Sequence, residues 1–498
     1  MESKQKSKLT LTALILMIFT SVYGFTNMPR TFYLMGYSGI IWYILSAILF
    51  FIPYAFMMAE YGAAYKHEKG GIYSWMERSV GPKYAFIGTF MWYASYLVWQ
   101  VNVASTIWVP LSNAIFGADL TQNLTYFGLK PTMWLGILAV LWIILVTFIS
   151  TQGLDKIKQV TSVGGLAVML LNVFLLLGGF IVLLLNGGQF SQPILNIVHD
   201  FTVSPNPEYQ TGLSTVSFLT YAIFAYGGIE AVGGLVDQTK NAEKTFPLGV
   251  TISAIVISIG YALGIFMIGT FINWQEILSL PGVNTANVTY IVMENLGVVL
   301  ATSLGASTQT ALTVGMWIAR LVGLSMFLAL TGAFFTLIYS PLKQLIEGTP
   351  KALWPKKFTE TKNNMPIYAM YVQAIIVILL TLIVAFGGDN ASAFFNKLVI
   401  MTNVAMTIPY MFVAVAFPFF KKKDSIHKPF EIYKSYTLSL IVSIIVTIVV
   451  GFANLFSIIE PGIVKGNWMD TILSGGGPLL FALIAFFIYK NYESKQAK

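Results

Sequence analysis

The chain has 498 residues, of which 56% are hydrophobic and 10% are charged, and it contains no cysteine. Ordinary soluble domains carry about 25% charged residues, so this composition indicates an integral membrane protein. The lack of cysteine excludes disulfides, thiolate catalysis and cysteine-based metal sites. The net charge of +8 is compatible with nucleic-acid binding, an anionic surface or a membrane topology signal, and the positions of the Lys and Arg residues decide between these interpretations.

A helix that crosses the hydrocarbon core of a bilayer needs roughly 20 apolar residues. Twelve stretches meet this requirement, near 10–36, 39–63, 84–116, 131–151, 159–186, 211–236, 248–273, 309–338, 366–387, 394–419, 435–458 and 474–489. The first follows Lys4, Lys6 and Lys8, as a signal sequence would, but it is longer than the apolar region of a signal sequence and has no small-x-small cleavage site. We therefore expect a retained helix.

Most Lys and Arg residues fall in the segments that lie on the same side as the N-terminus. The segments on the other side keep only Lys130 and Lys465, while Arg30, Arg320 and Lys397 fall inside spans. Because cytoplasmic segments carry the excess of positive residues, we expect both termini in the cytoplasm of a cell whose lysine-rich usage is typical of bacteria. The net charge is then explained by topology, and no nucleic-acid partner is expected.

Two spans carry sequences that break a helix, TSVYGFTNMP at 20–29 and FAYGGIE at 224–230. Unwound backbone at bilayer depth is costly unless it lines a cavity. Breaks at corresponding places in two halves indicate a secondary transporter with its substrate near the midplane. Spans 1 to 5 and 6 to 10 would form two inverted repeats, because an odd number of spans reverses the direction. The expected divisions are 1–186, 187–419, and 420–498 with two further spans.

Two loops are long enough to carry structure. The outer loop at 274–307 has apolar residues at mixed helical spacing and could form short lid helices. The inner loop at 341–365 contains Pro350, Pro355 and five lysines, and we expect a solvated connector with one amphipathic turn.

Three blocks of sequence resemble the amino acid-polyamine-organocation (APC) superfamily: AEYG at 59–62 followed by GGIYSW at 70–75 and GP at 81–82; AYGGIE at 225–230 with KNAEKTFP at 240–247; and, more weakly, SP at 340–341 through EG at 347–348 to MP at 365–366. Within it, VYGF at 22–25 is most similar to the glutamate/GABA antiporter branch. The resemblance implies an all-α, LeuT-type fold of about twelve helices and amino-acid transport, with exchange as one mode. The tail of about eight residues after the last span is shorter than the plugging segment of those antiporters, and helix 5 has no lysine between Val160 and Leu185. The coupling ion is therefore open.

A free amino acid needs a carboxylate site and an ammonium site, and broken helices supply both from their backbone. By motif position, the carboxylate would meet the amides of Tyr23 and Gly24, flanked by Val22. The ammonium would meet carbonyls of Thr20, Phe224 and Gly227, with the Phe224 ring covering the substrate. The alternative is that the glycines only permit close helix contact.

Charged and amide groups inside the spans are further candidates, because such residues must be paired or functional. Glu230 would carry a proton or hold the two half-helices together. Arg30 or Arg320 would face the cavity, where it recognises an acidic side chain or pairs with Glu230; the alternative is a structural pair or snorkelling. Asn102 in helix 3 would contact the substrate or pack a helix through its amide.

The leading hypothesis is a secondary active amino-acid transporter in the cytoplasmic membrane that works by alternating access. Its substrate would be an acidic amino acid exchanged for its decarboxylated amine, or a neutral or cationic amino acid or polyamine taken up with protons. A sensor or receptor is the non-transporter alternative. No enzyme is expected, since zincin and Walker motifs are missing, and His67, His199 and His427 have no ligand spacing. Neither a metal nor a cofactor is expected, and the oligomeric state is open.

Overall fold

The computed structural model describes residues 8–362 and 365–496. Lys4, Lys6 and Lys498, which contribute to the topology prediction, lie outside this range. The described residues form helices and turns, with isolated β-type pairing only between Leu9 and Thr239 and between Lys362 and Met365. The expected all-α class is confirmed.

The first part of the described chain contains eleven α-helices, here given with their bounds. They are α1 (Leu11–Val22), α2 (Asn27–Met35), α3 (Ser38–Ser46), α4 (Ile52–Ala64), α5 (Ile72–Ser79), α6 (Pro82–Thr106), α7 (Trp108–Phe116), α8 (Pro131–Ser150), α9 (Leu154–Leu185), α10 (Ile197–Thr202) and α11 (Gly212–Phe224). A π-helical turn, η1 (Ala47–Phe51), joins α3 to α4, and short 3-10 turns lie at η2 (Thr121–Asn123), η3 (Tyr126–Gly128) and η4 (Pro207–Tyr209).

The remaining elements begin with a 3-10 helix, η5 (Ile229–Gln238), and continue to the C-terminal end of the described chain. They are α12 (Ala242–Ile268), the π-helical turn η6 (Trp274–Leu278), α13 (Val288–Ser303), α14 (Thr308–Gly348), η7 (Lys351–Leu353), η8 (Lys356–Thr359), α15 (Ile367–Phe386), α16 (Gly388–Lys422), α17 (Tyr436–Lys465) and α18 (Trp468–Gln496).

Several helix ends follow directly from local sequence. The Thr10 side chain accepts a hydrogen bond from the Ala13 amide and caps α1, and Thr211 with Ser214 forms a capping box at α11. Such caps satisfy amides that have no partner within the helix. Pro82 and Pro131 begin α6 and α8, where the missing N–H of proline costs nothing.

Among the described residues, eleven helices or helix pairs are long and apolar enough to cross a membrane, against twelve predicted. The difference is the predicted span at 84–116, which the structure divides into α6 and α7 at Ile107. α6 has 25 residues and would extend about 37 Å, enough for a hydrocarbon core of about 30 Å. Its Trp and Tyr residues make it less apolar than the other spans, so it is the twelfth spanning helix by length alone.

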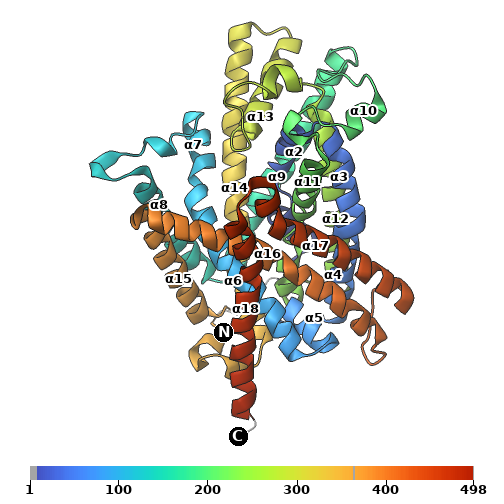
Figure 1. The fold of residues 1–498 in the computed structure, drawn as a ribbon, viewed down its shortest axis with the longest axis vertical. Coiled ribbons are helices and arrows are strands. Elements are labelled where there is room, and N and C mark those ends of the chain that lie inside the picture. The colour runs from blue at the N-terminus through green and yellow to red at the C-terminus, as the bar shows by residue number, and fades with distance from the viewer. Residues whose placement is uncertain (1–7, 363–364, 497–498) are drawn as a thin grey trace, which may run out of the picture.

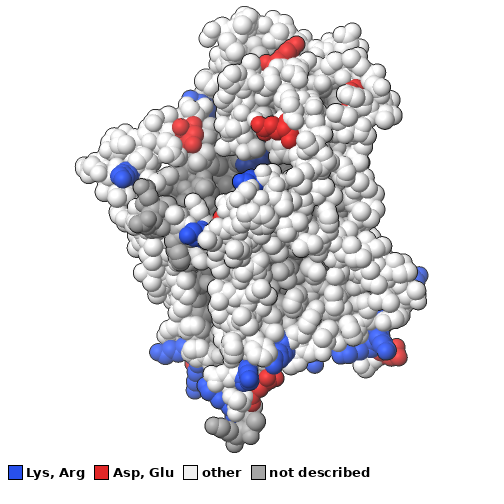
Figure 2. Space-filling model, in the orientation of Figure 1, with Lys and Arg blue, Asp and Glu red and all other residues white. Residues whose placement is uncertain are grey.

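The two ends of the molecule differ in charge. Lys and Arg gather at the lower end in Figure 2, and α10 and α13 lie at the opposite end in Figure 1. The last three helices contact one another, with α16 packed against both α17 and α18. α18 also runs to the end rich in Lys and Arg.

Both predicted helix breaks are present, and they lie side by side. Residues 23–26 separate α1 from α2, and residues 225–228 separate α11 from η5. Gly228 has a φ of 115°, and a Cβ on it would lie 2.4 Å from the Ser21 carbonyl oxygen. Only glycine therefore allows this approach. Further along, the Leu9 amide donates to Gln238 and the Lys240 amide donates to Leu9, both at 2.9 Å.

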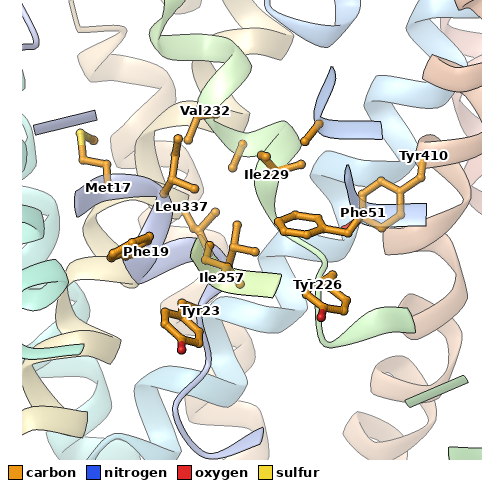
Figure 3. Close-up of a cluster of buried hydrophobic side chains, with 14 of the residues drawn as sticks. Met17, Phe19, Tyr23, Phe51, Tyr226, Ile229, Val232, Ile257, Leu337 and Tyr410 are labelled. Carbon is orange, nitrogen blue, oxygen red and sulfur yellow. The ribbon is translucent and has the colours of Figure 1, made fainter. Parts of the chain in front are cut away.

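Buried aromatic and aliphatic side chains surround the breaks. Figure 3 shows Tyr23 and Tyr226 from the two unwound segments, with Phe51, Ile257 and Leu337 from neighbouring helices. The Tyr226 ring stacks on Phe51 with centroids 4.6 Å apart. This packing, together with the hydrogen bonds of the two segments, fixes the unwound backbone.

The two long loops differ in how well they were predicted. The outer loop forms η6 and α13, which confirms the expected short helices. The prediction of a solvated connector is wrong for the first part of the inner loop, because α14 continues to Gly348 and Lys343 is buried. The Lys343 ammonium donates to the Gly234 carbonyl at 2.7 Å and pairs with Asp237, which compensates for its burial.

Candidate functional site

A cavity of about 430 Å³ lies beside the first helix break. Its walls come from the α1–α2 break, the junction of α6 and α7, α9, α14 and the segment before α13. Four predicted site residues line it: Thr20, Tyr23, Gly24 and Arg30. Among its described lining residues, Arg30 is the only Lys, Arg, Asp or Glu.

A second cavity of about 650 Å³ adjoins the first and shares Thr20 and Leu330 with it. Phe224 and Gly227 of the second break line this cavity, as do residues of α6, α14 and α16. It extends beyond the breaks to the facing ends of α17 and α18. Six of the ten predicted site residues therefore line two adjoining cavities, whereas Val22 is buried and lines neither.

The amides at the first break are not free where the motif placed them. The Tyr23 amide donates to Phe19 at 2.9 Å, and the Gly24 amide donates to the Tyr261 hydroxyl at 2.9 Å. The amides of Phe25 and Thr26 have no acceptor in the described part of the chain, and both residues line the first cavity. They precede α2, so the anion-attracting N-terminus of that helix lies two residues later than predicted.

Carbonyl groups at the breaks agree better with the motif positions. The residues that would satisfy the Thr20 carbonyl in a continuous helix donate elsewhere, since the Tyr23 amide bonds Phe19 and the Gly24 amide bonds Val22. Thr20 lines both cavities. The Phe224 carbonyl accepts the Gly227 amide at 3.0 Å, so it is already engaged. A half-exposed Phe224 ring lines the second cavity.

Tyr261 of α12 joins the two breaks, and sequence analysis missed it. Its hydroxyl accepts from the Gly24 amide at 2.9 Å and from the Asn27 side chain at 3.1 Å. The same hydroxyl lies 3.2 Å from the Val22 carbonyl and 3.3 Å from the Ala225 carbonyl. No local pattern marks one tyrosine within an apolar span, so nothing in the sequence pointed to it.

Glu230 is 1% exposed and lies behind the second break. One of its oxygens accepts from the Trp92 indole at 3.0 Å and from the hydroxyls of Tyr96 and Tyr410, both at 3.3 Å. The other accepts from the Gly228 amide at 3.2 Å. None of the ion pairs in the described part of the chain includes Glu230. This carboxylate therefore ties α6 and α16 to the unwound backbone, and it does not pair with an arginine.

The two arginines have different surroundings. Arg30 lines the first cavity and donates from Nε to the Thr285 carbonyl at 2.8 Å. Arg320 donates to the carbonyls of Ile115 and Phe116, at 3.0 and 3.1 Å, where α7 ends. It lines neither cavity, because capping a helix C-terminus holds its guanidinium there. Asn102 is exposed on α6 and also lines neither cavity.

Comparison with known proteins agrees with this architecture. Residues 9–486 match the family model described as amino acid permease. The chain belongs to this family. The inner membrane transporter YjeM of Salmonella typhimurium is 56% identical over 98% of this chain and 97% of its own length. The aspartate/glutamate permease AcaP of Lactococcus lactis is 26% identical over 80% and 77%. The glutamate/gamma-aminobutyrate antiporter of L. lactis is 21% identical over 91% and 84%. The expected APC membership is confirmed, and this permease is a multi-pass membrane protein of amino-acid transporter type.

Polar side chains of α14 hold η5, the second half of the second broken span, in this permease. Ser340 donates to the backbone carbonyl of Ala231, and Lys343 donates to that of Gly234. Gln344 donates to the backbone carbonyls of Glu230 and Ala231. The Gln344 side chain also accepts the Ile72 amide at 2.9 Å. η5 itself lines neither cavity. The two breaks therefore line cavities on one side, whereas on the side of η5 hydrogen bonds from α14 hold the backbone.

A buried charge cluster fastens the same end of the molecule. Glu60 is fully buried and accepts the amides of Ile432 and Tyr433, both at 2.7 Å. Lys421 lies 2.8 Å from Glu60 and 2.6 Å from Glu431. These contacts join the end of α4 to the segment that links α16 with α17.

Proposed function

We propose that this permease is a secondary active transporter that moves amino acids across the cytoplasmic membrane by alternating access. The observation that carries the proposal is the pair of adjoining cavities at two helix breaks. On the η5 side, hydrogen bonds between η5 and α14 close the path from these cavities. The cavities reach Ala286 and Lys465, which lie in or beside loops at the end poor in basic residues. With the basic end and both termini in the cytoplasm, this arrangement corresponds to an outward-facing state.

The substrate proposed for the central site is an acidic amino acid exchanged for its decarboxylated amine, glutamate for GABA. The free amides of Phe25 and Thr26 would receive the α-carboxylate. Arg30, the one charged residue among the described residues that line the first cavity, would receive the second carboxylate of glutamate or the single carboxylate of GABA. Aspartate, glutamate and gamma-aminobutyrate, which AcaP and the antiporter carry in their names, support this class. Carbonyls of Thr20 and Gly227 would accept the ammonium group.

We further propose that the two breaks are equivalent positions of an inverted repeat. The first repeat, 1–186, would end with α9, and the second, 187–419, would end within α16. The remainder, 420–498, would add α17 and α18. Glu230 and Phe224 then act as a structural tie and a gate at the second break.

Counterflow in proteoliposomes tests the function, with a matched pair of arginine variants. Vesicles preloaded with unlabelled glutamate or GABA should accumulate labelled glutamate without a pH gradient. Arg30→Ala should raise the KM for glutamate about tenfold or more, as expected for one lost charge-assisted bond. Arg320→Ala should leave that KM unchanged, because its guanidinium lies at the end of α7. Uptake that requires a pH gradient and ignores internal substrate would refute exchange, and equal effects of the two variants would refute recognition by Arg30.

A further inference from the structure

The second cavity has an outer part that the central site does not use. There it is lined by Glu460 and Lys465 of α17 and by Asp470 of α18. These are the only Lys, Arg, Asp or Glu among its described lining residues. Two carboxylates against one ammonium give this part a net negative charge, opposite to that of the first cavity with Arg30.

Each carboxylate has one oxygen without a protein partner in the described part of the chain. Glu460 uses one oxygen to accept the Ser217 hydroxyl at 2.8 Å. Ser217 lies on α11, the helix that ends at the gate residue Phe224. Asp470 uses one oxygen to accept a hydrogen bond from the side-chain amide of Asn467 at 2.8 Å. One whole oxygen of each carboxylate therefore remains able to accept a hydrogen bond from a ligand.

Backbone and hydroxyl groups add further acceptors. Pro461 and Pro478 lie inside α17 and α18, and a proline cannot donate to the carbonyl four residues earlier. Those carbonyls belong to Ser457 and Ser474, which both line the cavity. Ser474 is 4% exposed, and its hydroxyl makes no hydrogen bond with any described residue. This nearly buried serine therefore presents an unpartnered hydroxyl at the cavity wall, where it can accept a hydrogen bond from a polar ligand.

We infer that the α17–α18 end of the second cavity is a binding subsite for an organic ammonium group. An ammonium has three donors and no acceptor, and this wall offers carboxylate, carbonyl and hydroxyl oxygens. The cavity is continuous with Thr20, Phe224 and Gly227 at the breaks. In the transporter proposed above, on which this part of the inference rests, the subsite binds the amine end of a substrate on the outer side before it reaches the central site.

The absence of cysteine allows a direct chemical test in the purified protein. Two single variants, Ser474→Cys and Ser457→Cys, serve as reporters, and each contains one thiol only. The rate at which each thiol reacts is measured with a trimethylammonium and with a sulfonate methanethiosulfonate reagent. Each rate is divided by the rate at which the same reagent modifies a small free thiol. We expect a normalised preference for the cationic reagent of about tenfold or more, the lower range for charged clefts. Glu460→Gln with Asp470→Asn should abolish it.

Two controls use residues of the same cavities. Lys465→Gln, which removes the positive charge from the subsite, should increase the cationic preference. Ser325→Cys in the first cavity, the cavity of Arg30, should prefer the anionic reagent. An absence of cationic preference at both reporters, or a preference that survives the double carboxylate substitution, would overturn the subsite.

Protection experiments identify the ligand. n-Butylammonium should slow labelling of Ser474→Cys, whereas butyrate should not. Protection by sodium ions without protection by n-butylammonium would assign an inorganic cation and overturn the ammonium assignment.

A transport measurement places the subsite on the outer side. Glu460→Gln should raise the external KM for GABA and leave the internal KM unchanged; an equal change on both sides, or none, would overturn that placement. If the unsubstituted protein moves neither glutamate nor GABA, the proposed function fails, and the labelling experiment still decides the ammonium site.

Discussion

Replacing Tyr261 with phenylalanine removes one hydroxyl that holds both helix breaks, while the buried ring remains. The Gly24 amide and the Asn27 side chain lose an acceptor at 2.9 and 3.1 Å. A buried donor without a partner costs about 1–3 kcal/mol, so two donors correspond to about 2–4 kcal/mol, allowing for the remaining 3.1 Å contact of Gly24 with Val22. At about 2 °C per kcal/mol for a large chain, we expect the unfolding midpoint to fall by about 4–8 °C.

The matched control is Tyr226→Phe. Tyr226 is also fully buried at a break, but its hydroxyl makes a single hydrogen bond, to the Tyr43 carbonyl at 3.2 Å. We expect a loss of about 1 kcal/mol and a midpoint shift of about 2 °C. Thermal unfolding of both purified variants in the same detergent measures the difference. A Tyr261→Phe shift no larger than that of Tyr226→Phe would refute the role of Tyr261 as the junction of the breaks.

Three further substitutions test neighbouring contacts. Glu230→Gln should slow exchange through the loss of charge-assisted bonds of about 1.5–3 kcal/mol, but leave the shape of its pH profile unchanged; a lost pH dependence would instead assign proton carriage. Gly228→Ala should lower the yield of folded protein, because left-handed backbone costs about 1–2 kcal/mol and the new Cβ meets the Ser21 carbonyl; normal size-exclusion behaviour and stability would contradict this. Lys421→Met should destabilise by about 3–5 kcal/mol through the unpaired buried carboxylate, and Glu60→Gln in that background should restore part of the loss in thermal unfolding.

The class of fold and the position of the breaks were predictable because they depend on local composition. Long apolar stretches require helices in a bilayer, and the glycine-containing segment FAYGGIE can unwind where a helix of other residues would not. The outer loop was predictable for the same reason, since apolar residues in it had to pack. α6 shows the limit of this argument, because it is long enough to cross a bilayer but its Trp and Tyr residues lower its mean hydropathy.

Which side of a helix a residue occupies could not be read from its position. Arg30 and Arg320 look alike in sequence, yet one lines a cavity and the other caps α7. Asn102 and Lys343 were misjudged because burial depends on which helix packs alongside. The first amide without an acceptor is that of Phe25 instead of Tyr23, because the Tyr23 amide continues the hydrogen bonds of α1 and the Gly24 amide donates to the Tyr261 hydroxyl. Each of these outcomes depends on contacts between residues far apart in the chain.

The winding of η5 changes how far its residues reach. A 3-10 helix rises about 2.0 Å per residue, against 1.5 Å in an α-helix, so its ten residues extend about 20 Å instead of about 15 Å. An α-helix would need about three more residues to connect the second break with the pairing between Leu9 and Gln238. The stretched winding has weaker internal bonds, and for this reason Ser340, Lys343 and Gln344 meet its carbonyls along one side. Three extra residues inserted into η5 would allow ordinary α-helical winding, and the polar face of α14 would then lose the register in which it meets those carbonyls.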